Sequence, residues 1–259
     1  METVSAPPEA PRSPSFLARH QFLIYRLFSL SGLLPIGGYV IIHLLTNATI
    51  LDSPATFQSQ VDRIHSLGII LPVVEWTFIF IPILFHATVG WIIISGAMPN
   101  VGSYPYSGNV RYTLQRVTGI IAFFFVIAHV IHMHQLFAPL EKLGAAQFDH
   151  EHAASSAGAA LKSLGVQIFY AIGVLASVYH LANGLWTMGI TWGIWTTAAA
   201  QRRANYISIV LGSVVAVVGL SALWGMKNVD VERARKIEDN MLNARKLQMG
   251  EAPAPSEQP

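Results

Sequence analysis

Residues 166–191 read VQIFYAIGVLASVYHLANGLWTMGIT, a stretch without one Asp, Glu, Lys or Arg. About 20 mostly apolar residues are enough to cross the hydrocarbon layer as a helix. Four more stretches have this character, and each is too long for a core strand: Phe22–Asn47, Leu71–Met98, Tyr112–Phe137 and Tyr206–Met226. The sequence therefore predicts an all-α integral membrane bundle of five transmembrane helices.

The composition agrees with a lipid-facing surface. The 259 residues are 53% hydrophobic and 12% charged, whereas soluble domains have about 25% charged residues. The net charge of +2, without a basic cluster among aromatics, excludes a nucleic-acid partner. Because the chain has no cysteine, a disulfide, an iron–sulfur cluster or a thioether-bound haem would have to belong to a partner.

The hydropathy pattern divides the chain into three parts. Residues 1–20 form a polar, cytoplasmic N-terminal segment, and residues 21–226 form the five-span membrane domain. Residues 227–259 are a charged tail, which we expect to be helical at first and then disordered. We interpret this tail as a solvated appendage rather than as a clasp for a partner or another protomer.

Lys and Arg concentrate on the cytoplasmic side of short membrane loops. With a cytoplasmic N-terminus, the inner flanks contain Arg12, Arg19, Arg26, Arg111, Arg116, Arg202 and Arg203. The outer loops then contain only Arg63, Lys142 and Lys162. This asymmetry predicts a multi-pass protein with its N-terminus inside. Five spans would put the charged tail outside, and its own positive charges leave that point open.

Histidines inside the spans are the candidate functional residues. Ten histidines occur, and six of them fall at span ends or in loops, where we interpret them as solvated or interfacial: His20, His65, His132, His134, His150 and His152. The other four lie inside spans one to four, one in each: His43, His86, His129 and His180. Ionisable residues in the membrane interior are rare and mark functional sites.

The depths of these four histidines form two levels. At 1.5 Å per helical residue, His43 and His129 lie roughly 6–12 Å from the outer ends of their spans. His86 and His180 lie roughly 21–23 Å down, so the levels are about 9–17 Å apart. This arrangement predicts two stacked b-type haems, each held by two neutral imidazoles from different helices. A zinc site would need four ligands at one level, and non-haem iron would need carboxylates.

Polar residues at the inner ends of the spans are candidates for holding haem propionates. Arg26, Ser29 and Ser31 open the first span, and Gln115 and Arg116 open the third. Arg116 lies deeper in the apolar stretch than snorkelling to the interface requires, although contact with lipid headgroups is the alternative.

One carboxylate lies within the first four spans. Glu75 stands near the outer end of the second span, at about the depth of the outer histidines. Two interpretations stay open: a proton carrier for a quinone, because quinone chemistry moves protons with electrons, or a helix-start carboxylate that faces the headgroups.

Four strings in these spans resemble the helices of a known family. They are RLFSLSGLLPIGGYVIIHLL (26–45), IPILFHATVGW (81–91), LQRVTGIIAFFFVIAHV (114–130) and YHLANGLWTMGITWGI (179–194). The resemblance, in order and spacing, is to the single-subunit, two-haem cytochrome b558 of succinate dehydrogenases and fumarate reductases. It implies a bacterial cytoplasmic membrane protein that anchors a flavoprotein and an iron–sulfur subunit and reacts with quinone, usually menaquinone.

In that family the axial histidines match His43 and His129 for the outer haem, and His86 and His180 for the inner one. The depth count gives the same pairing. The resemblance implies electron flow from succinate through flavin and clusters to the inner haem, the outer haem and quinone, or the reverse during fumarate reduction. This chain would be the quinone-reacting subunit of the enzyme and would not itself act on succinate.

The sequence departs from some members at the last ligand. Those members have a glutamate near that histidine, linked to transmembrane proton movement, whereas Ser177, Val178 and Tyr179 precede His180 here; we therefore do not expect that proton path. Two other interpretations stay open: the cytochrome b of a hydrogenase- or formate-dehydrogenase-type enzyme, and a haemless anchor or transporter. Reaction direction, the quinone pocket and oligomeric state are also open, including a higher oligomer of the complex.

Overall fold

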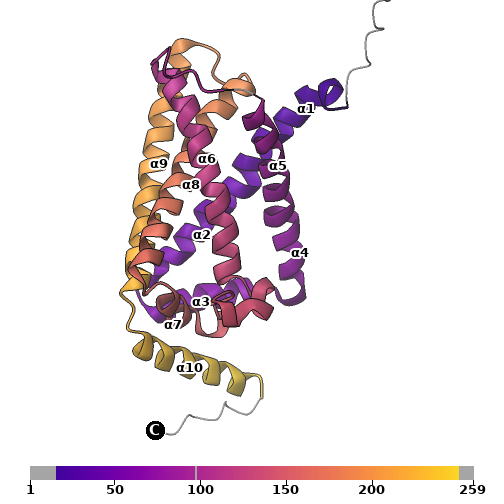
Figure 1. Ribbon diagram of the computed structural model, residues 1–259. Helices are drawn as coiled ribbons and strands as arrows, with labels where there is room; N and C mark the ends of the chain where they lie inside the picture. Colours follow the sequence, from indigo (N-terminus) through magenta and orange to yellow (C-terminus); the bar gives the residue numbers. More distant parts are fainter. Residues whose placement is uncertain (1–15, 97, 251–259) are drawn as a thin grey trace, which may run out of the picture.

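The computed structural model describes residues 16–96 and 98–250 of the chain. The described part contains five helical segments long and apolar enough to span a membrane, as the sequence predicted: Arg19–Leu51, Gly68–Ser95, Ser107–Met133, Leu164–Thr191 and Ala198–Lys227. They stand side by side as a bundle (Figure 1). Most of the N-terminal segment and the end of the tail, whose disorder the sequence predicted, lie outside the described residues.

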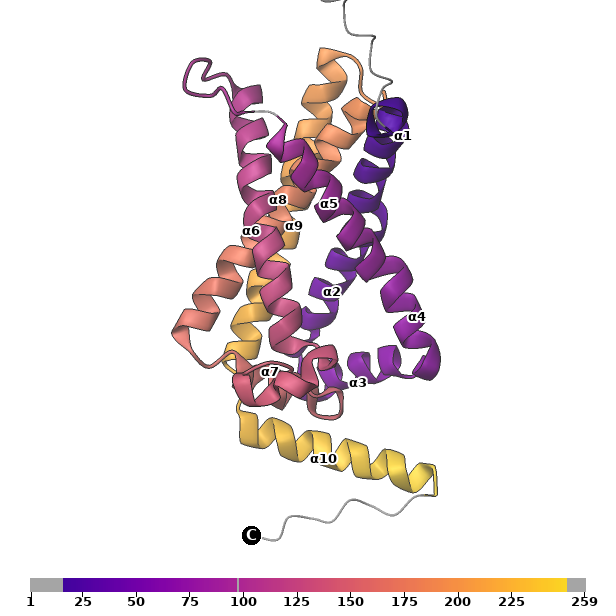
Figure 2. The same cartoon turned by 45° about the vertical axis from the view of Figure 1, so that its right-hand side comes forward.

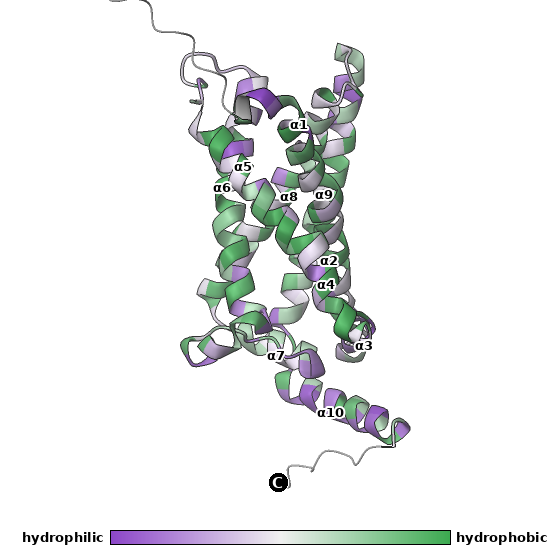
Figure 3. Cartoon of the chain, turned by 90° about the vertical axis from the view of Figure 1, so that its right-hand side faces the viewer, coloured by the Kyte–Doolittle hydropathy of each residue, from purple (hydrophilic) through white to green (hydrophobic). Residues whose placement is uncertain are grey.

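We call the end of the bundle at which the first helix begins the inner end, and the opposite end the outer end. Apolar side chains such as Ile42, Leu84 and Val217 are exposed along the bundle, as expected for a surface that faces lipid. Figure 3 shows the same pattern, since apolar residues dominate the long helices.

The first two spans each change their helical winding in the middle. The first span consists of α1 (Phe16–Ser31), the π-helical η1 (Gly32–Gly37) and α2 (Gly38–Ala48). The second follows the short η3 (Gly68–Ile70) and consists of α4 (Leu71–Glu75), the π-helical η4 (Trp76–Phe80) and α5 (Ile81–Ser95). A proline lacks a backbone N–H, and π-bulges are one way to accommodate it. Pro35 lies inside η1, and Pro82 is the second residue after η4.

The other three spans are continuous helices: α6 (Ser107–Met133), α8 (Leu164–Thr191) and α9 (Ala198–Lys227). Small residues allow α8 and α9 to approach closely, as is typical of membrane helices. A Cβ atom at Gly212 would lie 3.0 Å from the Cβ of Ala182, and one at Gly219 would lie 2.8 Å from Val174. The third predicted span is too long at its outer end, because α6 ends at Met133 and the 3-10 segment η5 (Gln135–Leu143) follows.

Short helices cover the outer end of the bundle. The turn η2 (Thr49–Leu51) leads from the first span into α3 (Pro54–His65), and η6 (His150–His152) leads into α7 (Ala153–Ala160). The C-terminal helix α10 (Val231–Gln248) runs across this end, outside α3 and α7 (Figure 2). We call α3, η6, α7 and α10 together the outer cap.

Helix α10 is packed against the outer cap. One face of the helix is buried, with Ala234 and Glu238 fully covered and Leu242 nearly so. The guanidinium of Arg245 lies 3.1 Å from the carboxylate of Asp62 on α3. The interpretation of the tail as a solvated appendage is therefore wrong for this helix. Residues four apart share one helix face, and the buried face consists of Ala234, Glu238 and Leu242. This set is too short and too polar to be recognised in the sequence of a charged segment.

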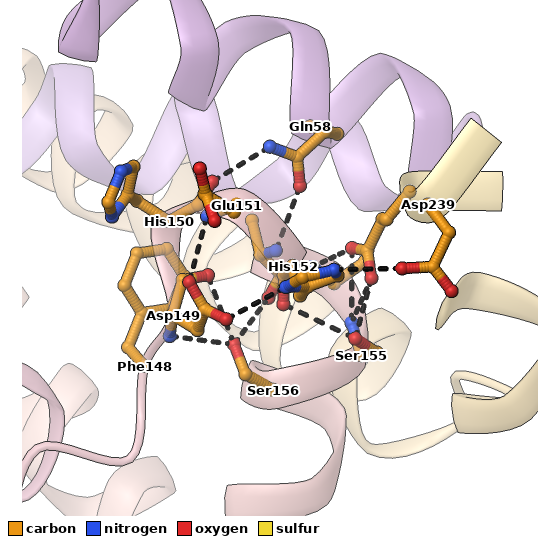
Figure 4. Close-up of polar contacts among 12 residues, drawn as sticks. Gln58, Phe148, Asp149, His150, Glu151, His152, Ser155, Ser156 and Asp239 are labelled. Carbon is orange, nitrogen blue, oxygen red and sulfur yellow. Dashed lines mark hydrogen bonds and ion pairs between the residues drawn. The ribbon is translucent and has the colours of Figure 1, made fainter. Parts of the chain in front are cut away.

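The start of α7 is capped by residues from two other helices. The residue before α7, His152, makes no side-chain cap. Instead, the backbone N–H of Ala153 donates to the Gln58 side chain at 2.8 Å, and that of Ala154 donates to the Glu238 carboxylate at 2.6 Å. Figure 4 shows Gln58 reaching this turn from α3. The first N–H groups of a helix have no acceptor within the helix and need one from elsewhere. Here the acceptors come from α3 and α10, so these bonds join α3, α7 and α10 into one unit.

Candidate functional site

The inner pair consists of His86 on α5 and His180 on α8. Their ring centres are 6.1 Å apart and the rings are perpendicular. The Nδ1 atom of His86 lies 3.0 Å from the carbonyl oxygen of Phe28, and that of His180 lies 3.0 Å from the carbonyl oxygen of Gln115. Each imidazole is thus oriented by a backbone carbonyl of a neighbouring span.

Two glycines make room for the inner rings. A Cβ atom at Gly32 would lie 2.4 Å from the ring of His86, and one at Gly119 would lie 2.8 Å from the ring of His180. Phe28 also stacks on His86, with ring centres 4.3 Å apart. The backbones of η1 and α6 therefore form one wall for each histidine, which only glycine permits at this distance.

The outer pair consists of His43 on α2 and His129 on α6, with ring centres 5.9 Å apart. The Nδ1 atom of His43 lies 3.4 Å from the hydroxyl of Tyr39, and its Nε2 atom lies 3.2 Å from the amide of Asn47. The Nδ1 atom of His129 lies 3.2 Å from the hydroxyl of Tyr170. The structure thus brings together the two pairs that the depth count predicted.

The spacing and the Nδ1 contacts of both pairs fit a haem iron, and the Asn47 amide must turn aside from Nε2 of His43 when that atom binds a metal. A metal binds imidazole nitrogen at about 2 Å, so two rings on opposite sides of one iron have centres about 6 Å apart. An acceptor at Nδ1 keeps the proton there and leaves the Nε2 lone pair for a metal. Among residues 16–96 and 98–250, no group of three or more His, Cys, Asp or Glu residues is placed to hold a bare metal ion.

A polar network extends from the inner pair to the inner end of the bundle. The Gln115 amide lies 3.4 Å from His180 Nε2, so it must turn aside when that atom binds a metal. Asn183 donates to Gln115 at 2.7 Å and accepts from Arg111 Nε at 2.8 Å. Arg111 also lies 4.0 Å above the ring of Trp186. The sequence reasoning missed Arg111 and Asn183, although Asn183 is part of the quoted string HLANGLW.

The residues predicted for propionates are engaged with other partners. Arg116, buried, donates from two nitrogens to the last carbonyls of α5, those of Ile93 and Ile94, at 3.2 Å each. The guanidinium of Arg26 lies 5.0 Å from the ring of Trp192. Ser29 donates to the carbonyl of Arg26 at 3.0 Å and accepts from Trp192 at 2.9 Å, and Ser31 donates to the carbonyl of Phe28 at 2.9 Å.

Glu75 has a partner at the outer end. Its carboxylate lies 3.8 Å from Nε2 of His134. Because Nδ1 of His134 accepts from the backbone N–H of Leu136 at 3.0 Å, the proton of a neutral ring is on Nε2 and faces Glu75. The rings of Phe80 and His134 are in edge contact at 5.5 Å. The contact between Glu75 and His134 joins α4 to the segment that follows α6.

Not all of the six remaining histidines are solvated or interfacial. His152 is buried and hydrogen-bonds to Asp149 at 2.8 Å and to Asp239 at 3.0 Å (Figure 4). His65 and His150 stack with ring centres 4.3 Å apart. Burial lowers the pKa of His65, the neighbouring His150 and His134 lower it further, and Asp62 partly offsets them. Asp149 is only three residues from His152, but the sequence could not reveal the contact with Asp239 or the stacking of His65 on His150, because these partners come from distant parts of the chain.

Five apolar helices that enclose two histidine pairs at different depths define a polytopic membrane protein. Residues 99–220 match a family model described as succinate dehydrogenase/fumarate reductase transmembrane subunit. The chain is also 35% identical over 204 residues, which are 79% of this chain and 96% of the relative, to the succinate dehydrogenase cytochrome b558 subunit of Bacillus subtilis (strain 168). The chain belongs to the succinate dehydrogenase/fumarate reductase transmembrane subunit family, as the resemblance of its helices indicated.

Proposed function

We propose that this chain is the membrane-anchoring dihaem cytochrome b subunit of a succinate:quinone oxidoreductase or quinol:fumarate reductase. It would pass electrons between an iron–sulfur subunit and a membrane quinone, with menaquinone as the quinone of this type of cytochrome. The observation that carries the proposal is the presence of two histidine pairs, each with a spacing of about 6 Å that suits one iron. The family match favours this function over a hydrogenase- or formate-dehydrogenase-type cytochrome.

The roles of the histidines follow from their hydrogen bonds. His86 and His180 would be the axial ligands of the inner haem, and His43 and His129 those of the outer haem. Haem b, when bound, supplies one-electron chemistry. Acceptors at Nδ1 hold the imidazoles in the tautomer that presents Nε2, and they raise its basicity.

The inner end of the bundle offers positive charge to propionates. Arg26 and Arg111 are the cations that lie beside Trp192 and Trp186 there, and Ser29 and Gln115 add donors. We assign these four residues to the propionate region of the inner haem. Arg116 would act mainly on the helix end, because its guanidinium bonds the α5 carbonyls, where cations are favourable.

The pair of Glu75 and His134 is our candidate for proton exchange with quinone. Reduction of a quinone takes two protons with two electrons, and a carboxylate beside an imidazole N–H gives a donor and an acceptor at one place. Replacing Glu75 by Gln should reduce quinone-dependent turnover at least tenfold and leave both haem spectra unchanged, and Asp should retain part of the activity. Unchanged turnover in Glu75→Gln would remove Glu75 from the proposal.

The proposed partners are a flavoprotein subunit and an iron–sulfur subunit at the inner end, in a bacterial cytoplasmic membrane with the N-terminus inside. Their presence would account for the absence of cysteine from a redox subunit. Purification of the chain from its native membrane tests this directly. We expect both subunits to accompany it and two low-spin haems b per chain.

Single ligand substitutions test the two levels. His43→Ala should remove one haem and His86→Ala the other, because each pair serves one iron. A colourless wild-type protein would exclude the cytochrome function, and equal loss of both haems in each variant would exclude the two-level arrangement.

A further inference from the structure

The two histidine pairs differ in what their Nδ1 atoms contact. In the inner pair both contacts are backbone carbonyl oxygens, at 3.0 Å. In the outer pair both are tyrosine hydroxyls, at 3.4 Å for Tyr39 and 3.2 Å for Tyr170. A carbonyl can only accept, whereas a hydroxyl can accept and donate. The outer histidines are therefore oriented by side chains, which a substitution can remove, whereas the backbone carbonyls at the inner histidines cannot be removed in this way.

Tyr170 makes the closer of the two contacts and has a second partner. It lies on α8, is buried, and its hydroxyl is 2.9 Å from Nδ1 of His132. His129 and His132 are three residues apart on α6 and so share a helix face. One hydroxyl of α8 thus bridges two imidazoles of α6.

The direction of these two hydrogen bonds follows from their number of protons. When Nε2 of His129 binds iron, its Nδ1 has the proton and donates to the Tyr170 oxygen. The hydroxyl has one proton, which is then free for Nδ1 of His132. His129 thus donates to Tyr170, and Tyr170 donates to His132. The hydrogen bond to His132 polarises the hydroxyl and makes its oxygen a better acceptor for His129.

We propose that Tyr170 is a positioning residue for the outer haem: it fixes the tautomer and orientation of His129 and sets the electron-donating strength of this ligand. The inference rests on the proposed function, because it concerns the haem at the outer level. A hydrogen-bond acceptor at Nδ1 makes an imidazole more basic, and this favours ferric over ferrous iron. Tyr170 accordingly holds the potential of the outer haem lower than it would be without the hydroxyl.

Packing alone does not explain a tyrosine at this place. The ring of Tyr170 lies edge-on to Phe125 at 5.5 Å and next to Phe169 at 5.9 Å, contacts that a phenylalanine would make equally well. A buried tyrosine hydroxyl needs a hydrogen-bond partner, and here both partners are histidines. Tyr170→Phe therefore removes the hydrogen bonds and keeps the shape.

The test is a redox titration of the purified, complete complex with wild-type chain, Tyr170→Phe and the control Tyr206→Phe. Tyr206 is 68% exposed near the start of α9. In Tyr170→Phe we expect two haems per chain, a rise in the midpoint potential of one haem and an unchanged potential of the other. The low-spin ferric electron paramagnetic resonance signal of the same haem should shift. Tyr206→Phe should match the wild type.

Two haems with wild-type potentials in Tyr170→Phe would overturn the inference, as would an equal shift of both potentials. If wild-type complex does not contain two haems, the proposed function fails instead. If Tyr170→Phe loses the outer haem, the variant His132→Leu provides the test. It keeps the Tyr170 hydroxyl and removes only the imidazole that accepts its hydrogen bond. A smaller rise of the same potential in His132→Leu supports the inference, and no change in that variant overturns it.

Discussion

The absence of a Cβ atom at Gly32 allows the first span to approach the ring of His86 closely. A methyl group at Gly32 would overlap the ring of His86, whereas Gly38, a few residues along the same span, has nothing within 4 Å of its added Cβ. We expect Gly32→Ala to displace His86 and to lower the content of one haem at least twofold. Gly38→Ala is the matched control and should keep both haems, since Ala is favourable in a helix. Equal haem content in the two variants would contradict the role of Gly32.

Acid should loosen the outer cap in two steps, and the first comes from His65. Because the pKa of His65 is lowered in the folded protein, chiefly by burial, the fold favours the neutral ring. Its contribution to stability is lost as pH falls below the unfolded value of about 6.5. Hydrogen exchange of α3, corrected for the intrinsic rate, should increase from pH 7 to pH 5. The same increase in His65→Gln would contradict this assignment.

The second step belongs to Asp149. Burial alone raises the pKa of its carboxyl, but the hydrogen bonds from His152 and from the N–H of Glu151, with nearby His150, bring it below its ordinary value. A carboxyl of this kind stabilises the fold above its unfolded pKa of about 3.9, and the effect is lost as pH falls through the folded pKa. Exchange at the start of α7 should therefore increase again below about pH 4. Asp149→Asn should remove this second step only.

Among the elements, α7 depends on acceptors from distant parts of the chain. The Glu238 carboxylate accepts from the backbone of Ala154 and from the hydroxyl of Ser155 at 2.5 Å. Glu238→Ala would leave these buried donors without an acceptor, at a cost of about 1–3 kcal/mol for such a group. We expect a lower melting temperature and faster exchange in α7. Glu232→Ala, an exposed glutamate on the same helix, should behave as wild type.

The contrast between spans and cap explains what the sequence could predict. Hydropathy and a rise of 1.5 Å per residue are local and regular properties, so five spans and the pairing of His43 with His129 could be inferred. The cap depends on contacts such as Gln58 with Ala153, ninety-five positions apart. Such contacts leave no periodic signal. Tyr170 was missed for a similar reason, because a tyrosine in an apolar helix resembles a packing residue until its partners are known.

For the whole molecule, the five spans put the start of α1 and the helix α10 at opposite ends (Figure 1). The chain has no cysteine, so a single introduced thiol is the one site on this chain that a maleimide can label. If the N-terminus is cytoplasmic, Lys236→Cys on the exposed face of α10 should react with a membrane-impermeant maleimide in spheroplasts. Arg203→Cys, exposed at the start of α9, should react only after the membrane is opened. The reverse pattern would invert the proposed orientation and move the outer haem to the cytoplasmic side. Labelling of both thiols in sealed spheroplasts would contradict the presence of one membrane span, α9, between positions 203 and 236.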